Sequence, residues 1–123
     1  MRKVTQYFDI IYSIVERCGA IDDDVQYLQV SQIEGIVDGV LYFADGSRLE
    51  FTERVVIRGY RPFKERYRYQ YLQDDETIFR YDNAPHHLHL PTFPHHKHEG
   101  DTIVAASEPT LQQALAEIAR LMN

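Results

Sequence analysis

Six histidines lie within residues 83–101, and their spacing is the most unusual chemical feature of the chain. His86-His87-Leu88-His89 follows a proline, and His95-His96-Lys97-His98 follows another proline nine residues later. Imidazole nitrogens bind transition metals and exchange protons near neutral pH, so this segment could serve either purpose. In an extended strand every second side chain points to the same side, so alternate histidines could bind one metal ion together. The candidate ligands for a zinc, iron, nickel or copper ion are His86, His87, His89, His96, His98 and Asp82.

A basic and tyrosine-rich segment comes directly before the histidines. Its seven basic side chains fall within 27 residues and are Arg54, Arg58, Arg61, Lys64, Arg66, Arg68 and Arg80. Arginine forks bind phosphate groups, and tyrosine rings offer faces on which unpaired bases stack. Arg66, Arg68, Tyr69 and Tyr81 are therefore candidates for binding RNA. The alternative is a sheet whose tyrosines face the core while its arginines pair with acidic residues.

Together, these residue types resemble those that a metal-independent ribonuclease uses. Such an enzyme needs a base for the ribose 2′-hydroxyl, a cation for the phosphate and an acid for the leaving oxygen. The candidate catalytic residues are His95, His96, His98, Lys97 and Arg80, with the histidines as base and acid. This hypothesis requires no cofactor. Two others fit the sequence: a protein or enzyme that binds a divalent transition metal through the histidines, and a non-catalytic interaction module, such as a homodimer.

Hydrophobic periodicity predicts the elements that must position these residues. Residues 3–18 repeat apolar side chains at spacings of three and four, which is typical of an amphipathic helix that ends at Gly19. Alternating patterns predict five strands, over residues 25–31, 33–43, 48–58, 65–73 and 77–82. Asp45-Gly46 suits a tight hairpin turn, and Gly59–Pro62 is expected to interrupt the sheet after the third strand.

The remaining segments connect or flank these strands. Asp22–Asp24 is expected to form a solvated loop, and residues 83–101 are expected to form an irregular but ordered loop. A short sixth strand is predicted over 102–106, and Ser107 is expected to cap a final helix with Pro109 in its first turn. The fold class is therefore α+β. We expect one domain over 1–123, with a mostly antiparallel meander of five to six strands flanked by an N-terminal and a C-terminal helix.

The net charge of −6 is unevenly spread along the chain. Residues 1–53 hold four basic and ten acidic side chains, whereas residues 54–98 hold eight basic and five acidic ones. A phosphate-bearing partner would therefore be met in the middle of the chain. A single cysteine, Cys18, excludes an internal disulfide framework and fits a reducing cytoplasm. No apolar run approaches the roughly 20 residues that span a bilayer, so we expect a cytoplasmic protein without membrane contact.

Three segments resemble the TumE-like proteins, which are small prokaryotic toxin components of type II toxin-antitoxin pairs. They are Lys64–Tyr71, Ile78–His87 and Phe93–His98, with the strings FRYDNAPHH and FPHHKH. The resemblance implies a cognate antitoxin as partner, growth inhibition and an attack on RNA or translation, and it does not imply a metal. The positions that match the motif are Arg66, Arg68, Tyr69, Arg80, Tyr81, Asp82, His86, His87, His95, His96, Lys97 and His98.

Overall fold

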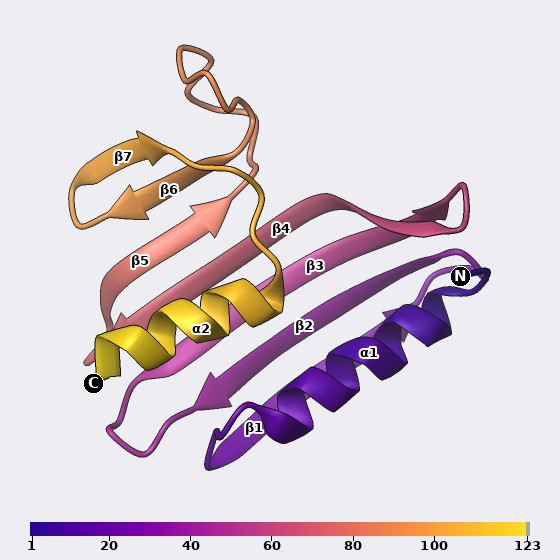
Figure 1. Cartoon of the computed structure of the whole chain (residues 1–123), viewed down its shortest axis with the longest axis horizontal. Helices are drawn as coiled ribbons and strands as arrows, with labels where there is room; N and C mark the ends of the chain where they lie inside the picture. The colour runs from indigo at the N-terminus through magenta and orange to yellow at the C-terminus, as the bar shows by residue number, and fades with distance from the viewer. Residues whose placement is uncertain (123) are drawn as a thin grey trace.

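The computed structural model describes residues 1–122 as one antiparallel sheet with two helices on the same face (Figure 1). The strands follow each other across the sheet in chain order, so each is hydrogen-bonded to its sequence neighbours. The elements are α1 (Val4–Arg17), β1 (Asp22–Gln29), β2 (Glu34–Tyr42), β3 (Arg48–Arg58), β4 (Arg61–Gln73), β5 (Glu76–Asp82), β6 (His96–Glu99), β7 (Thr102–Ala105) and α2 (Leu111–Met122). The predicted α+β meander is confirmed, with seven strands rather than five or six.

Residues of each central strand alternate between two faces of the sheet. One face carries the core and packs against both helices. The opposite face, called the open face below, is covered by neither helix (Figure 1). In β4, Tyr67, Tyr69 and Tyr71 are buried on the helix side, whereas Arg66 and Arg68 are exposed on the open face. The alternative in which the tyrosines face the core therefore describes this strand, and Tyr69, a candidate for binding RNA, lies on the face opposite to Arg66 and Arg68.

Helix α1 covers the sheet with the face that the periodicity predicts. Val4, Phe8, Ile11 and Val15 are buried in the core, and Cys18 is partly buried against it. The helix ends where expected, because Gly19 adopts a positive φ of 81° just beyond the cap residue. Glycine adopts this backbone conformation without steric cost, which is why it commonly follows a helix.

Two glycines of β2 allow α1 and the neighbouring strands to approach closely. The pairing of β2 with β1 and with β3 is regular at Gly35 and Gly39, so neither glycine marks a bulge. A Cβ atom at Gly35 would lie 2.4 Å from Cζ of Phe8 and 3.0 Å from the carbonyl oxygen of Leu28. Close packing is thus the role of Gly35.

A methyl group at Gly35 is therefore expected to displace the ring of Phe8. Gly35→Ala should lower the free energy of unfolding by about 1–3 kcal/mol, the usual range for overpacking a core. Urea denaturation followed by circular dichroism measures the change. The double variant Phe8→Leu/Gly35→Ala should recover part of the loss, because leucine is shorter at the point of contact. An unchanged midpoint for Gly35→Ala alone would contradict the close-packing role.

The hairpin between β3 and β4 differs from the sequence expectation. Gly59 and Tyr60 form a two-residue turn with φ values of 56° and 62°, which is the pattern of a type I′ turn. Strand β4 then starts at Arg61, four residues earlier than predicted. Pro62 is tolerated because β5 pairs with β4 only from Arg68 onward, which leaves this part of β4 with a free edge.

Three further segments also differ from the predictions. Asp22–Asp24 belongs to β1 instead of a loop; exposed carboxylates suit an edge strand because they discourage pairing with other chains. The histidine segment is not loop throughout, since His96–Glu99 forms β6 and pairs with β5. The final helix starts at Leu111, because Thr110 rather than Ser107 caps it through reciprocal hydrogen bonds with Gln113.

A buried polar network links both helical segments to the sheet. Glu53 in β3 is 0% exposed and accepts hydrogen bonds from the hydroxyl groups of Tyr7 in α1 and Tyr69 in β4. The ammonium group of Lys64 donates to the Tyr69 hydroxyl over 2.7 Å and to the carbonyl of Pro109, just before α2. Burial lowers the pKa of Lys64. Each of the four side chains of this network therefore has a hydrogen-bond partner.

Candidate functional site

Alternate residues of β4, β5 and β6 meet on the open face of the sheet. The strand register places Arg68 opposite Asp82 and Asp82 opposite His96, in one row across three strands. Arg80 lies opposite His98 in the adjacent row. We call these five residues, together with Arg66 and His87, the open-face cluster. Residues far apart in the sequence are thus brought together by the pairing of β6 with β5.

Asp82 is the anchor of the open-face cluster. Its side chain is 9% exposed and accepts hydrogen bonds from Nε of Arg80 at 3.1 Å and from the backbone N–H of Ala84 at 3.0 Å. Nε2 of His96 lies 3.0 Å from the same carboxylate, and Nδ1 of His96 lies 3.0 Å from the carbonyl of Pro94. The two ring nitrogens of His96 are thus each within hydrogen-bond distance of a neighbour on the protein. His96 is therefore a buried imidazole held in a fixed orientation between Asp82 and Pro94.

His98 and His87 differ from His96 because their nitrogens do not face two acceptors. Nη2 of Arg80 lies 2.9 Å from Nε2 of His98, and a guanidinium only donates, so this nitrogen carries no proton. Burial and the charge of Arg80 lower the pKa of His98. Partial burial and the charge of His96 likewise lower the pKa of His87. Both imidazoles are neutral at pH 7 and can accept a proton.

The backbone of His87 is unusual for a residue with a side chain. Its φ of 59° lies in the left-handed region, and its ring centre is 4.9 Å from that of His96 and 6.1 Å from that of His98. Residues that are not glycine are held in this region at some cost, and they gather at functional sites. The turn at His87 thus places a neutral imidazole over β6.

The open-face cluster lines a cavity of about 280 Å³ that is rich in positive charge. Three guanidinium groups, from Arg66, Arg68 and Arg80, contribute to its wall, and Asp82 is the only carboxylate among the lining residues. Among residues 1–122, Arg66 and Arg68 have no acidic group within 4.0 Å. Guanidinium groups without a carboxylate partner are suited to bind a phosphate group.

The lowered pKa of His98 predicts that acid weakens the fold. Between the lowered pKa of His98 in the folded protein and the ordinary histidine value of 6.5, the unfolded state binds more protons than the folded state. The free energy of unfolding therefore falls as the pH drops through this window. His98→Gln removes this titration and keeps an acceptor for Arg80. We expect the loss of unfolding free energy between pH 7.5 and pH 5 to be smaller in this variant than in the wild type. Chemical denaturation at both pH values measures the difference. The exposed His89 provides the control variant His89→Gln, and equal losses in all three proteins would contradict the prediction.

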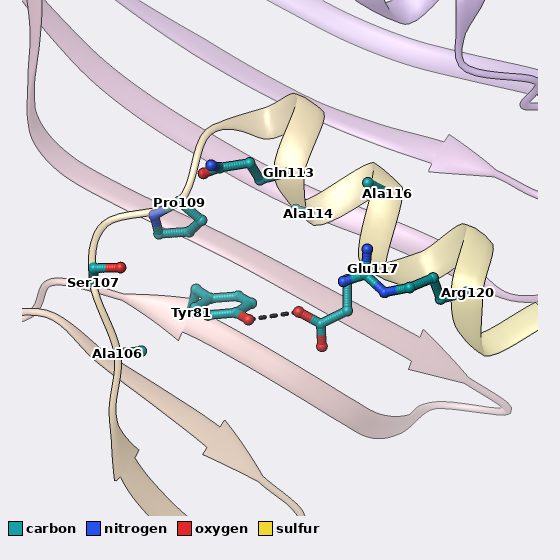
Figure 2. Close-up of a pocket in the computed structure, with 9 residues that line it drawn as sticks. All are labelled: Tyr81, Ala106, Ser107, Pro109, Gln113, Ala114, Ala116, Glu117 and Arg120. Carbon is teal, nitrogen blue, oxygen red and sulfur yellow. Dashed lines mark hydrogen bonds between the residues drawn. The ribbon is translucent and has the colours of Figure 1, made fainter.

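Several predicted site residues lie on the helix side of the sheet. Figure 2 shows Tyr81 pointing from β5 toward Glu117 of α2, with the hydroxyl and the carboxylate joined by a hydrogen bond of 2.5 Å. Nζ of Lys97 lies 2.9 Å from Glu117 and 3.0 Å from Glu99. Partial burial alone would lower the pKa of Lys97, but its hydrogen bonds to Glu117 and Glu99 raise it. Tyr81 and Lys97 thus attach α2 to the sheet.

Tyr69 and His95 are also separated from the open-face cluster. Tyr69 is 0% exposed and donates to the buried Glu53. The ring of His95 stacks on Tyr67 with the centres 5.8 Å apart, and its Nδ1 lies 2.9 Å from the Tyr67 hydroxyl. Of the histidines outside β6, His86 is exposed beside the cavity. His89 is exposed and its ring centre is 6.0 Å from that of His87.

Asn83 is a positioning residue that sequence reasoning missed. Its Oδ1 accepts from the backbone N–H of Tyr67 at 2.9 Å, and its Nδ2 donates to the carbonyl of Glu65 at 2.9 Å. The side chain continues the hydrogen-bond pattern of β5 beyond its last residue and fixes β4 at Arg66. An asparagine directly after a predicted strand and before Ala84-Pro85 is the signal that could have indicated this role.

No helix among residues 1–122 is long and apolar enough to cross a bilayer. In comparisons with known proteins, no curated protein and no solved structure matches the chain. A family model described as Toxin TumE matches residues 11–122, which include the C-terminal half of α1, all of α2 and every residue of the open-face cluster. This match agrees with the resemblance of the segments around Arg66, Arg80 and His96. The chain therefore belongs to the Toxin TumE family.

Proposed function

We propose that this protein is an RNA-directed toxin that acts as a metal-independent ribonuclease through the open-face cluster. The observation that carries the proposal is the cavity in which Arg66, Arg68 and Arg80 adjoin the neutral imidazoles of His87 and His98. Phosphodiester cleavage by the ribose 2′-hydroxyl needs a cation at the phosphate and a base near the sugar. The cavity offers both kinds of group on one surface.

In this proposal the arginines hold the phosphate and the two neutral histidines move protons. His87 takes the proton of the 2′-hydroxyl, and the oxygen attacks phosphorus while the bond to the 5′ oxygen breaks. His98, which is neutral in the resting protein, first takes up a proton from solvent and then gives it to the leaving oxygen, so the products carry a 2′,3′-cyclic phosphate and a 5′-hydroxyl. His96 does not transfer protons in this scheme, because Asp82 and Pro94 engage both of its nitrogens.

Growth arrest and RNA cleavage test the proposal. Expression of the chain alone should stop growth, and the purified protein should cleave RNA in the presence of chelator. His87→Ala should abolish both effects while the thermal unfolding transition is retained. His89→Ala is the matched control, because His89 is exposed and does not line the cavity. A folded His87→Ala variant with full toxicity would remove His87 from the mechanism. Wild-type protein that arrests growth without cleaving RNA would overturn the ribonuclease.

The toxin family also supports the proposal of a partner that silences the protein. We infer that a cognate antitoxin binds this chain and prevents growth arrest. Co-expression with the product of an adjacent gene should restore growth, and the two proteins should then co-purify. Growth arrest that no adjacent gene product relieves would contradict the pairing.

A metal centre on the same histidines is the second candidate function. Single ligand atoms of His87, His96 and His98 lie within 4.8 Å of one another, and three imidazoles suit zinc, nickel or copper. The donor set fits a cation poorly as it stands, because Nε2 of His98 faces the guanidinium of Arg80 and both nitrogens of His96 are engaged. Metal analysis of untagged protein distinguishes the candidates. Stoichiometric metal together with cleavage that chelator abolishes would favour the metal centre.

A further inference from the structure

A row of cationic side chains continues from the open-face cluster along the β3–β4 hairpin. The strand register pairs Arg54 with Arg66 and Arg58 with Arg61 across the two strands. Like charges directly opposite each other destabilise a sheet, so these pairs cost stability unless an anion lies between them. Among residues 1–122, Arg54, Arg61 and Arg66 have no carboxylate within 4.0 Å, and Arg58 reaches Glu65 at 3.4 Å.

Phe63 places an exposed aromatic ring within this row. It lies opposite Val56, between the two arginine pairs, and is 51% exposed. The guanidinium of Arg58 lies 5.0 Å from the ring centre, so a cation and an aromatic face are presented together. The buried tyrosines of β4 face the helices instead. Phe63 is therefore the aromatic residue of β4 that a ligand on the open face can reach.

The hairpin extends beyond the ends of β5 and β6 (Figure 1). Only residues 68–73 of β4 pair with β5, so the part that carries Arg61, Phe63 and Arg66 has no strand beside it on that edge. Phe63 and Arg68 pair with Val56 and Thr52, which are four residues apart in β3, so the distance between them is about 13 Å at roughly 3.3 Å per residue. That length accommodates a short stretch of extended single strand, and it ends at the cavity to which Arg68 belongs.

We propose that the open face of the β3–β4 hairpin is a binding track for single-stranded RNA, which leads the substrate into the cavity of the open-face cluster. The inference rests on the proposed ribonuclease and names its substrate class. Arginines bind successive phosphates, and an unpaired base stacks on Phe63. Stacking on a protein aromatic ring requires that the base has left its duplex. A base inside an RNA duplex cannot present its ring face to Phe63 on β4.

Binding of uncleavable RNA tests the track separately from catalysis. The probes are fluorescent 2′-O-methyl oligouridylates of eight and three nucleotides, whose blocked 2′ oxygens cannot attack phosphorus. Fluorescence anisotropy should show tighter binding of the longer probe by the wild type. Phe63→Leu should weaken binding of that probe about tenfold, because stacking on one aromatic ring is lost. Phe63→Tyr should bind like the wild type, and Arg48→Ala is the control, since Arg48 pairs with Glu50 and Asp75 away from the row.

Each outcome either supports or overturns the track. Equal affinities for the two probes, equal affinities of Phe63→Leu and wild type, or equal affinity for a duplex of the same length would each overturn it. RNA cleavage in a parallel assay would leave the ribonuclease proposal intact in any of those cases. Length-dependent binding that Phe63→Leu weakens, without cleavage of unmodified RNA, would support the track and overturn the ribonuclease. The exposed position of Phe63 predicts that both variants fold, which thermal unfolding checks.

Discussion

Replacing Arg80 by alanine is expected to lower the rate of RNA cleavage by about 100-fold to 1000-fold, the usual cost of removing one preorganised charge from a transition state. Arg80 contacts both His98 and Asp82, so the change removes the donor that holds His98 and, in the proposed mechanism, a cation at the phosphate. Cleavage of a defined oligoribonucleotide gives the ratio of kcat/KM between variant and wild type. Growth arrest should weaken in parallel.

Two further variants separate charge from geometry at this position. Arg80→Lys keeps the charge but loses the planar fork, so we expect activity between those of wild type and Arg80→Ala. Arg48→Ala removes an arginine from the same face of the sheet, where Arg48 pairs with Glu50 and Asp75, and should retain activity. Equal activity of Arg80→Ala and wild type would exclude Arg80 from phosphate binding.

Removing the buried carboxylate of Glu53 is expected to cause the largest loss of stability. Glu53→Ala leaves the hydroxyl groups of Tyr7 and Tyr69 without their acceptor in the core. Each buried donor without a partner costs about 1–3 kcal/mol, so we expect the free energy of unfolding to fall by about 4 kcal/mol. Urea denaturation measures the change. Glu50→Ala is the matched control on the open face of the same strand and should fall within about 1 kcal/mol of the wild type.

A triple variant shows whether the loss comes from unsatisfied donors. Tyr7→Phe/Glu53→Leu/Tyr69→Phe removes both donors with the acceptor and fills the space with apolar side chains. Replacing buried polar partners together is often neutral, whereas removing one partner is not, and Lys64 keeps the carbonyl of Pro109 as its acceptor. We therefore expect the triple variant to be more stable than Glu53→Ala. A triple variant as unstable as the single one would show that Lys64, which donates to Tyr69, needs the network intact.

Most of the fold could be predicted because its signals are local. The β2–β3 hairpin follows from Asp45-Gly46, where Gly46 adopts a φ of 86°. Strand β3 begins and ends at the predicted residues, Arg48 and Arg58. The early start of β4 could not be predicted in this way. Pro62 has no N–H to donate, so it is acceptable in β4 only because β5 does not pair with that part of the strand. Strand β6 was missed because His96–Glu99 has no apolar alternation. Its pairing with β5 places His96 beside Asp82.

The composition of the candidate site could be predicted, but its division between two faces could not. The motif groups His96, Lys97 and His98, yet alternation along β6 places Lys97 on the helix side and the two histidines on the open face. Which of them adjoin Arg80 depends on the register between β5 and β6. That register involves residues on opposite sides of a long connection, and single-strand patterns carry no information about it.

The acidic edge strand β1 and the basic central strand β4 make the charge of the molecule uneven across the sheet. Asp22–Asp24 lies at one edge, while the arginines of β4 lie three strands away in the middle of the sheet. A polyanion that diffuses toward the protein is repelled at β1 and attracted at β4. Such a field orients partners before contact and loses this influence as salt screens it. The same aspartates that block edge pairing therefore also select the side from which an encounter begins.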